Sequence, residues 1–305
     1  MKNTKIFGAL LVTVLAFALF SCSSPSDSDG SSNEPTVERT KVDGKIGEYG
    51  SPYEVGDIVY RDGSATPYKS GLELEDTQKE NAIAIIFYKG NTLNSDDANG
   101  DTDTSKTRTL GVGLKSGKNL EWGSDDTLYD YRAYGNIADI TTIRCEVSGN
   151  EGNYTISGDK NGSDNLEQIG EFIDSCNGVY DSIYTIENDT DQENKYPAFY
   201  FAKNYKNIAS KVKNSAFEDK WYYPSIAELY KIYKVKSTVD GAIKLCGGTE
   251  FGETYDYSAS SQAPKNEEDI LPSKKHIYLL NFRTGVISLG DKDFPHTVCA
   301  IREFN

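Results

Sequence analysis

The sequence predicts an α+β fold, and three observations predict it. Apolar runs typical of strands fill the first half of the chain, helical periodicity fills the middle, and strand-like runs return near the end. Strands followed by helices and again by strands favour a domain in which the opening and closing strands pair. A chain of this length buries about three quarters of its unfolded surface, so we expect a real core, in either one large domain or two small ones.

The N-terminus is typical of an export signal. Lys2 and Lys5 precede an apolar run from Ile6 to Phe20, which is shorter than the roughly 20 residues of a membrane span. The run ends in Leu19-Phe20-Ser21-Cys22, which resembles a bacterial lipobox. We therefore expect Cys22 to be acylated and to anchor the chain to a membrane. The alternative is an ordinary signal peptide with an incidental cysteine.

A polar segment follows the expected anchor. From Ser23 to Pro35 no residue is able to enter a core, which indicates a flexible, acidic tether. We expect a signal peptide over 1–21, an acylated cysteine with its tether over 22–43, and an ectodomain over 44–305. The localisation that follows is the bacterial outer membrane or cell surface.

The charge of the chain excludes some partners. Its 32 Lys and Arg residues against 47 Asp and Glu give a formal net charge of −15. Nucleic acids and anionic lipid surfaces are bound through basic clusters, so neither is an expected partner of the folded domain.

Strands are predicted first. Asp57–Gly63 is a short strand that runs into a turn, and the near-continuous apolar run Ala82–Tyr88 is typical of a buried strand. Arg108–Leu114 predicts another strand. Between them, residues 94–104 form a polar, acidic segment.

Helices are predicted next. Asp164 with Glu167 and Ser225 with Glu228 are capping-box patterns, and Pro197 is favoured at a first helical position. The first of these helices belongs to a segment, 155–195, that we interpret as an insertion. The apolar stripe after Pro197 extends as far as Val212, which predicts one long helix. A further short helix should end at Leu245-Cys246, before two glycines.

The chain closes in strands. Tyr278, Leu280 and Phe282 alternate with polar residues, and Arg283-Thr284-Gly285 supplies a turn into a returning strand over 286–289. Residues 298–304 form the closing strand.

Four cysteines remain besides Cys22. In an exported chain, Cys145, Cys176, Cys246 and Cys299 permit two disulfides. Cys145 and Cys299 both lie in strand-like runs, so we expect those two to pair. The alternative is buried free thiols.

Reactive centres are not expected. The chain has only two histidines, His276 and His296, and neither lies in a nucleophile motif or near a cysteine pair. The acidic residues of 96–103 miss the spacing of an EF-hand, which favours a solvated loop over a calcium site. We therefore expect no catalytic residues, no metal site and no cofactor.

Four segments together resemble a known family. They are Trp221-Tyr222-Tyr223-Pro224-Ser225-Ile226-Ala227-Glu228-Leu229, Tyr257-Ser258-Ala259-Ser260-Ser261, Phe282-Arg283-Thr284-Gly285 and Val298-Cys299-Ala300-Ile301-Arg302. In order and spacing they resemble the C-terminal domain family of the Legionella collagen-like adhesins, as found in exported spirochaete lipoproteins. The resemblance covers about Val55 to Phe304, and Ser258 stands where the family has a tryptophan. Its structural landmarks here are Trp221, Pro224, Ser225, Glu228, Gly285 and Arg302.

The resemblance implies a C-type-lectin-like fold, related to that of the formylglycine-generating enzyme. Two main helices would pack on small antiparallel sheets, with long recognition loops on one side. Cys246 and Cys299 match no motif of that enzyme, so we expect binding without catalysis. The implied ligand-binding residues are Tyr255, Tyr257, Gln262, Arg283, Asp291 and Asp293. Tyrosines offer contact area and a hydroxyl, although these could equally pack the rim of the domain.

These expectations lead to one main function hypothesis. The chain would be a surface-exposed lipoprotein that binds a glycan or a host extracellular protein. The alternatives are an envelope-assembly lipoprotein facing the periplasm and, less favoured, an enzyme on the related fold.

Overall fold

The structure is a computed structural model that describes residues 53–95, 104–124, 140–175, 193–253, 256–264 and 276–304. The chain divides into two compact units, Met1–Val37 and Glu38–Asn305, and all described residues belong to the second. The expected leader, Cys22, the tether, the acidic residues 96–103 and Cys176 lie outside the described residues. Among the helices that are described, none is long and apolar enough to cross a membrane.

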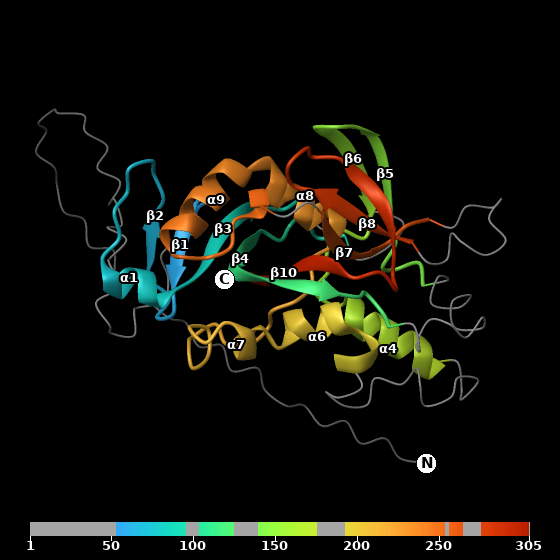
Figure 1. The fold of residues 1–305 in the computed structure, drawn as a ribbon. Coiled ribbons are helices and arrows are strands. Elements are labelled where there is room, and N and C mark those ends of the chain that lie inside the picture. The colour runs from blue at the N-terminus through green and yellow to red at the C-terminus, as the bar shows by residue number, and fades with distance from the viewer. Residues whose placement is uncertain are drawn as a thin grey trace, which may run out of the picture. The chain divides into compact units, whose positions relative to one another are not determined.

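One large sheet organises the described residues (Figure 1). Its strands, in the order β2-β1-β3-β4-β10-β7-β8-β9, are Ala65–Pro67, Asp57–Tyr60, Ala82–Gly90, Arg108–Leu120, His296–Glu303, Asp256–Gln262, His276–Asn281 and Ile287–Asp291. Every pairing is antiparallel except that of β10 with β7. A separate hairpin joins β5 (Cys145–Asn150) to β6 (Asn153–Gly158).

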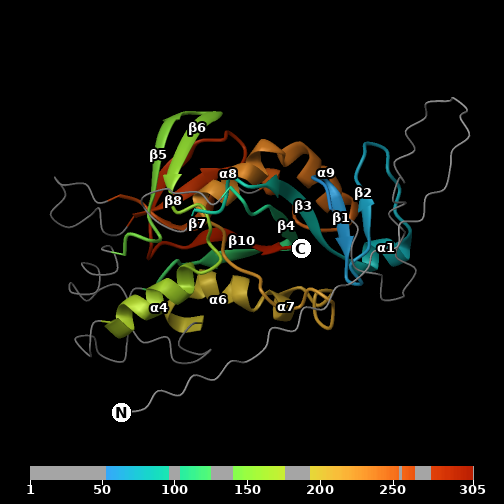
Figure 2. The same ribbon diagram turned by 180° about the vertical axis from the view of Figure 1, so that it is seen from behind.

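Short helices cover both faces of this sheet (Figures 1 and 2). On one face lie α8 (Ile226–Lys234) and α9 (Lys236–Leu245), and on the other α4 (Asn165–Ser175), α6 (Pro197–Lys203) and α7 (Tyr205–Ile208). The remaining short elements are α1 (Asp76–Asn81) and the 3₁₀ turn η1 (Phe251–Glu253).

The expected fold class was wrong. The structure is mostly β, with one large mixed sheet and short helices, and not two main helices packed on small antiparallel sheets. The longest helix in the described residues, α4, has 11 residues. The local patterns located most strands, but they could not show that β10 joins two groups of strands into one sheet, because that pairing connects residues far apart in the sequence.

β10 is the strand on which the two halves of the sheet meet. It pairs antiparallel with β4, with Glu303 opposite Leu110, and parallel with β7, with Thr297 opposite Tyr257. The expected pairing of the closing strand with a strand of the first half is therefore confirmed. Both faces of β10 are buried, because Cys299 and Ile301 enter one core and their neighbours enter the other.

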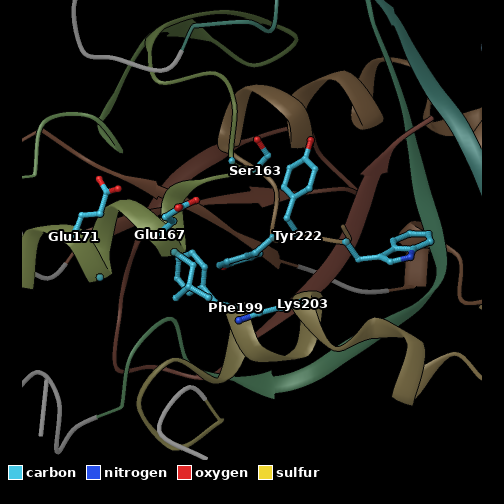
Figure 3. Close-up of a pocket in the computed structure, with 11 residues that line it drawn as sticks. Ser163, Glu167, Glu171, Phe199, Lys203 and Tyr222 are labelled. Atoms are coloured by element: carbon cyan, nitrogen blue, oxygen red, sulfur yellow. The ribbon is translucent and has the colours of Figure 1, made fainter. Parts of the chain in front are cut away.

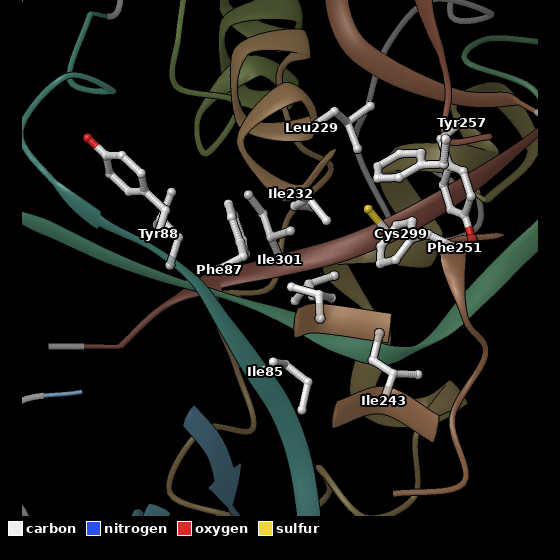
Figure 4. Packing of buried hydrophobic residues seen from close by; sticks show 14 of the residues in the cluster. Ile85, Phe87, Tyr88, Leu229, Ile232, Ile243, Phe251, Tyr257, Cys299 and Ile301 are labelled. Atoms are coloured by element: carbon white, nitrogen blue, oxygen red, sulfur yellow. The ribbon is translucent and has the colours of Figure 1, made fainter. Parts of the chain in front are cut away.

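Figure 4 shows the first of these cores. Ile301 of β10 and Phe87 of β3 lie beneath Leu229 and Ile232 of α8, and Ile243 of α9 closes the cluster. A strand with helices on both faces must be apolar on both faces. This explains why the strand over Ala82–Tyr88, which is confirmed, shows an almost continuous apolar run.

Most of the expected helix boundaries are confirmed. Ser225 is the N-cap of α8 and forms the predicted capping box with Glu228, and Pro197 begins α6. The expected end of a helix at Leu245 is also confirmed. The prediction of a single long helix after Pro197 was wrong, because α6 ends at Lys203 and a second helix, α7, follows.

The carboxylate of Glu228 does more than cap its own helix. Its side chain is fully buried and accepts hydrogen bonds from four donors on three segments of the chain. The donors are Arg108 Nη1 (3.3 Å), Tyr222 Oη (2.7 Å), the Ser225 backbone N–H (2.9 Å) and the Gly162 backbone N–H (3.1 Å). Burial raises the pKa of Glu228, while these donors act in the opposite direction.

We expect Glu228→Gln to destabilise the protein by about 3–5 kcal/mol, because a neutral amide offers one acceptor oxygen to donors that now share two. Urea unfolding, followed by the fluorescence of the buried Trp122 and Trp221, measures this change. The matched control is Glu80→Gln on the exposed side of α1, which should change stability by less than about 0.5 kcal/mol. Equal stability of the two variants would contradict the role given to Glu228.

The turn between β8 and β9 requires a glycine. Gly285 has φ +81° and donates its N–H to the Asn281 carbonyl at 2.7 Å. A Cβ there would also overlap the Tyr233 hydroxyl. Gly71 has a similar φ of +78° but nothing within 4 Å of its Cβ position, so the two glycines separate backbone strain from steric overlap.

Gly71→Ala should therefore lower the free energy of unfolding by about 1–2 kcal/mol, because alanine is strained at this positive φ. Gly285→Ala should lower the free energy of unfolding by about 1–3 kcal/mol more than Gly71→Ala, because the Tyr233 side chain must also move. Parallel urea unfolding of the two variants checks this difference. Finding the two equally stable would show that the Tyr233 contact imposes no constraint.

Candidate functional site

A cavity of about 480 Å³ lies between α4, α6 and residues 221–223 (Figure 3). This volume is within the range of pockets that hold small ligands. The three elements come from well-separated parts of the sequence, so the cavity exists only in the folded protein.

The inner wall of the cavity is aromatic. Phe199 of α6 packs edge to face against Tyr223, with ring centroids 5.0 Å apart, and against Trp122, at 5.2 Å. Tyr196 completes the cluster, 5.9 Å from Trp122. Because these rings support one another, the apolar wall is held in a single arrangement.

The rim of the cavity is polar. Glu167 and Glu171 lie one turn apart on α4, Ser163 precedes that helix, and Lys203 is the last residue of α6. All four side chains are exposed. In the view of Figure 3, Glu167 and Lys203 lie on opposite sides of the Phe199 ring. The rim therefore presents hydrogen-bond acceptors from one helix and a cationic donor from the other.

Two residues that line the cavity are hydrogen-bonded to the buried carboxylate of Glu228. Gly162, on the cavity wall, donates to Glu228 Oε2 at 3.1 Å, and Tyr222 donates to Glu228 Oε1 at 2.7 Å. Figure 3 shows the Tyr222 hydroxyl directed away from Phe199. Arg108 bonds the Tyr222 hydroxyl at 2.8 Å, and Asn165 at the start of α4 bonds Ser260 Oγ at 2.9 Å. Rigid support of this kind suits a binding site.

The chemistry of the cavity is that of recognition. Neither a histidine nor a cysteine is among its described lining residues. In the described part of the chain, no group of three or more His, Cys, Asp or Glu side chains is placed to hold a metal ion. What the cavity does offer is carboxylate acceptors, a hydroxyl and an ammonium around an apolar wall. Such a set can bind a ligand that has both apolar faces and several hydrogen-bonding groups.

Two of the expected ligand-binding residues are in the interior. Tyr257 is fully buried, with its ring tilted against Phe251 and edge to face with Phe282. Its hydroxyl shares a hydrogen bond with Ser116 Oγ at 2.8 Å. Gln262 is 2 % exposed. Both are core residues, so their expected role in a surface site was wrong. Tyr255 lies outside the described residues.

The other three expected ligand residues lie near the β8–β9 end of the sheet. Arg283 is exposed in the turn after β8. Asp291 ends β9 with its carboxylate 3.1 Å from His276 Nδ1, and Asp293 is partly buried in the following turn. The structure thus separates these three residues from the cavity at α4 and α6.

Most structural landmarks of the predicted family pattern lie in the core, whereas Arg302 is partly buried. Trp221 is 2 % exposed and donates from Nε1 to the Phe217 carbonyl at 2.8 Å. The Pro224 carbonyl accepts from the Ser260 N–H at 2.9 Å. Arg302 donates to the Asp219 carbonyl at 2.6 Å and lies over the Phe217 ring at 4.8 Å.

The expected disulfide between Cys145 and Cys299 was wrong. Both thiols are free and buried, and so is Cys246. Cys145 lies at the start of the β5–β6 hairpin and donates to the Asp159 carbonyl at 2.5 Å, whereas Cys299 lies in the core between β10 and α8. Both runs are strand-like, as expected, but the strands are not neighbours.

Sequence reasoning missed the cavity residues. Glu167 and Glu171 share one exposed side of a predicted helix, which was a visible pattern. That Phe199 and Lys203 would face them depends on how α6 packs, and no local pattern shows this.

Comparison of the chain with models of known families finds no match, and comparison with curated proteins also finds none. The resemblance to the Legionella collagen-like domain stays a prediction.

The three described thiols should resist alkylation in the folded protein. Burial raises the pKa of Cys145 and Cys299, and it raises that of Cys246 to about 12, so little thiolate is present at pH 8. We expect iodoacetamide to label all three only after unfolding, without any reductant, as measured by peptide mass spectrometry. A requirement for reductant at any of the three would show that it is oxidised.

Proposed function

We propose that this chain is an exported lipoprotein whose ectodomain binds a glycan in the cavity between α4 and α6, without catalysis. The observation that carries the proposal is the cavity itself, with two exposed carboxylates and a lysine around an aromatic wall. Sugars combine apolar ring faces with hydroxyls, and carboxylates are strong acceptors for hydroxyl donors.

The position in the cell is inferred from the N-terminus. The Leu19–Cys22 pattern supports acylation, and the polar segment after it supports a tether that holds the ectodomain away from the membrane. A displayed domain with a built recognition cavity is suited to contact glycans of a host or of another microbe.

A glycan array probed with the purified full chain in detergent tests this function. We expect binding to a restricted set of glycans. The double variant Glu167→Gln with Glu171→Gln should weaken that binding roughly 10- to 100-fold, because each lost charged acceptor is worth about 1.5–3 kcal/mol and the amides retain part of it.

Glu80→Gln is the control, since it makes the same chemical change on α1, outside the lining of the cavity. Unchanged binding in the double variant would place the site elsewhere. The absence of binding to any glycan by correctly folded protein would overturn the proposal.

Protease treatment of intact cells distinguishes the two orientations. An outward-facing ectodomain should be cleaved within minutes, whereas a periplasmic one should survive until the outer membrane is permeabilised. Survival on intact cells would favour the envelope-assembly alternative.

A further inference from the structure

A lysine is buried beside a glutamine at the end of β7. Lys292, between β9 and β10, is 1 % exposed, and its Nζ contacts Gln262 Oε1 directly. The same nitrogen lies 4.4 Å from the centroid of the Trp122 ring. Lysine is rarely buried to this extent without a carboxylate partner, and no carboxylate among the described residues lies within ion-pair distance of it.

Backbone hydrogen bonds hold the two residues that carry these side chains in place. The Lys292 carbonyl accepts from the Gly123 N–H at 3.2 Å, and the Gln262 N–H donates to the Ile143 carbonyl at 2.8 Å. Trp122 is tied to β7 through its Nε1, which donates to the Ser260 carbonyl at 3.0 Å. The amine and the amide are therefore fixed in contact by the fold, which removes the entropic cost of bringing them together.

The surroundings make the neutral amine accessible near neutral pH. Burial lowers the pKa of Lys292 to about 7, and the positive charge of Arg144 acts in the same direction. A neutral lysine amine is a nucleophile, whereas an ammonium is not. Arg144 forms a backbone β-bridge with Gln262, and its charge acts on Lys292, whose Nζ contacts the Gln262 amide oxygen.

We propose that Lys292 and Gln262 form an intramolecular isopeptide bond. This inference is independent of the glycan-binding function. It assigns to Gln262 a covalent role in the interior in place of the ligand contact expected from the sequence.

The reaction is an amide exchange that needs no oxidant and no cofactor. The Lys292 Nζ attacks the side-chain carbonyl carbon of Gln262, and a C–N bond forms. The bond from that carbon to Nε2 breaks, and Nε2 leaves as ammonia with a proton that Nζ has given up. Arg144, whose charge acts on Lys292, has the sign that would stabilise the negative charge developing on the adjacent Oε1.

The bond would join β7 to the turn between β9 and β10. β7 is separated from β9 by β8 in the sheet, so the link would span three strands. A covalent link of this kind limits the unfolding of the last part of the sheet, which is an advantage for a domain exposed outside the cell.

Tryptic peptide mapping of the full chain tests the proposal. Reduction and alkylation come first, because Cys246 and Cys299 lie in the two peptides concerned and could otherwise link them. An acylated Lys292 is not cleaved by trypsin. We therefore expect one branched product of residues 245–265 and 284–302, lighter than the two linear peptides together by one ammonia molecule.

Two variants provide the controls. Lys292→Arg and Gln262→Leu should yield only linear peptides and a mass without the loss of ammonia. The proposal would be overturned if the unaltered protein yielded three linear peptides in amounts matching other tryptic peptides. These peptides are 245–265, 284–292 and 293–302. Lys292 and Gln262 would then be joined by a hydrogen bond only. The unaltered protein decides the question, so the result does not depend on whether either variant folds.

Discussion

The buried carboxylate of Glu228 is the constraint on which the rest of the described structure depends. An ion in the interior must be matched by donors from its surroundings, and here they come from β4, from the segment before α8, from the start of α8 itself and from the loop before α4. One side chain therefore links a strand, the start of α8 and the loop that leads into α4.

The candidate cavity is a consequence of this arrangement. Gly162 and Tyr222 line it and both donate to Glu228, so the position of the cavity wall follows from the buried carboxylate. The aromatic cluster around Phe199 supplies the opposite side. The exposed glutamates of α4 can change with little effect on this framework, because their side chains extend from a helix whose start is held by Asn165.

Arg108 and Lys292 are both buried, and the structure compensates for the cost of burying a positive charge in a different way at each. Arg108 is paired with carboxylates and a tyrosine hydroxyl, which raise its pKa and keep it charged despite burial. Lys292 has no such carboxylate in the described residues, and burial instead favours its neutral form. The first site stabilises the fold as an ion pair, and the second provides the nucleophile for the proposed covalent bond.

The sequence by itself determined the local elements. The capping box of Ser225 and Glu228, the proline that begins α6, the buried run of β3 and the glycine turn before β9 depend on neighbouring residues, so their patterns were visible. Only the tertiary structure decided that β10 joins the sheet on both sides, that Tyr257 and Gln262 are buried, that Cys145 and Cys299 remain apart, and that α4 and α6 enclose a cavity. These features depend on contacts between residues that are distant in the chain. Hydrophobic periodicity indicates which face of a helix or strand is buried, but it does not show which other element covers that face.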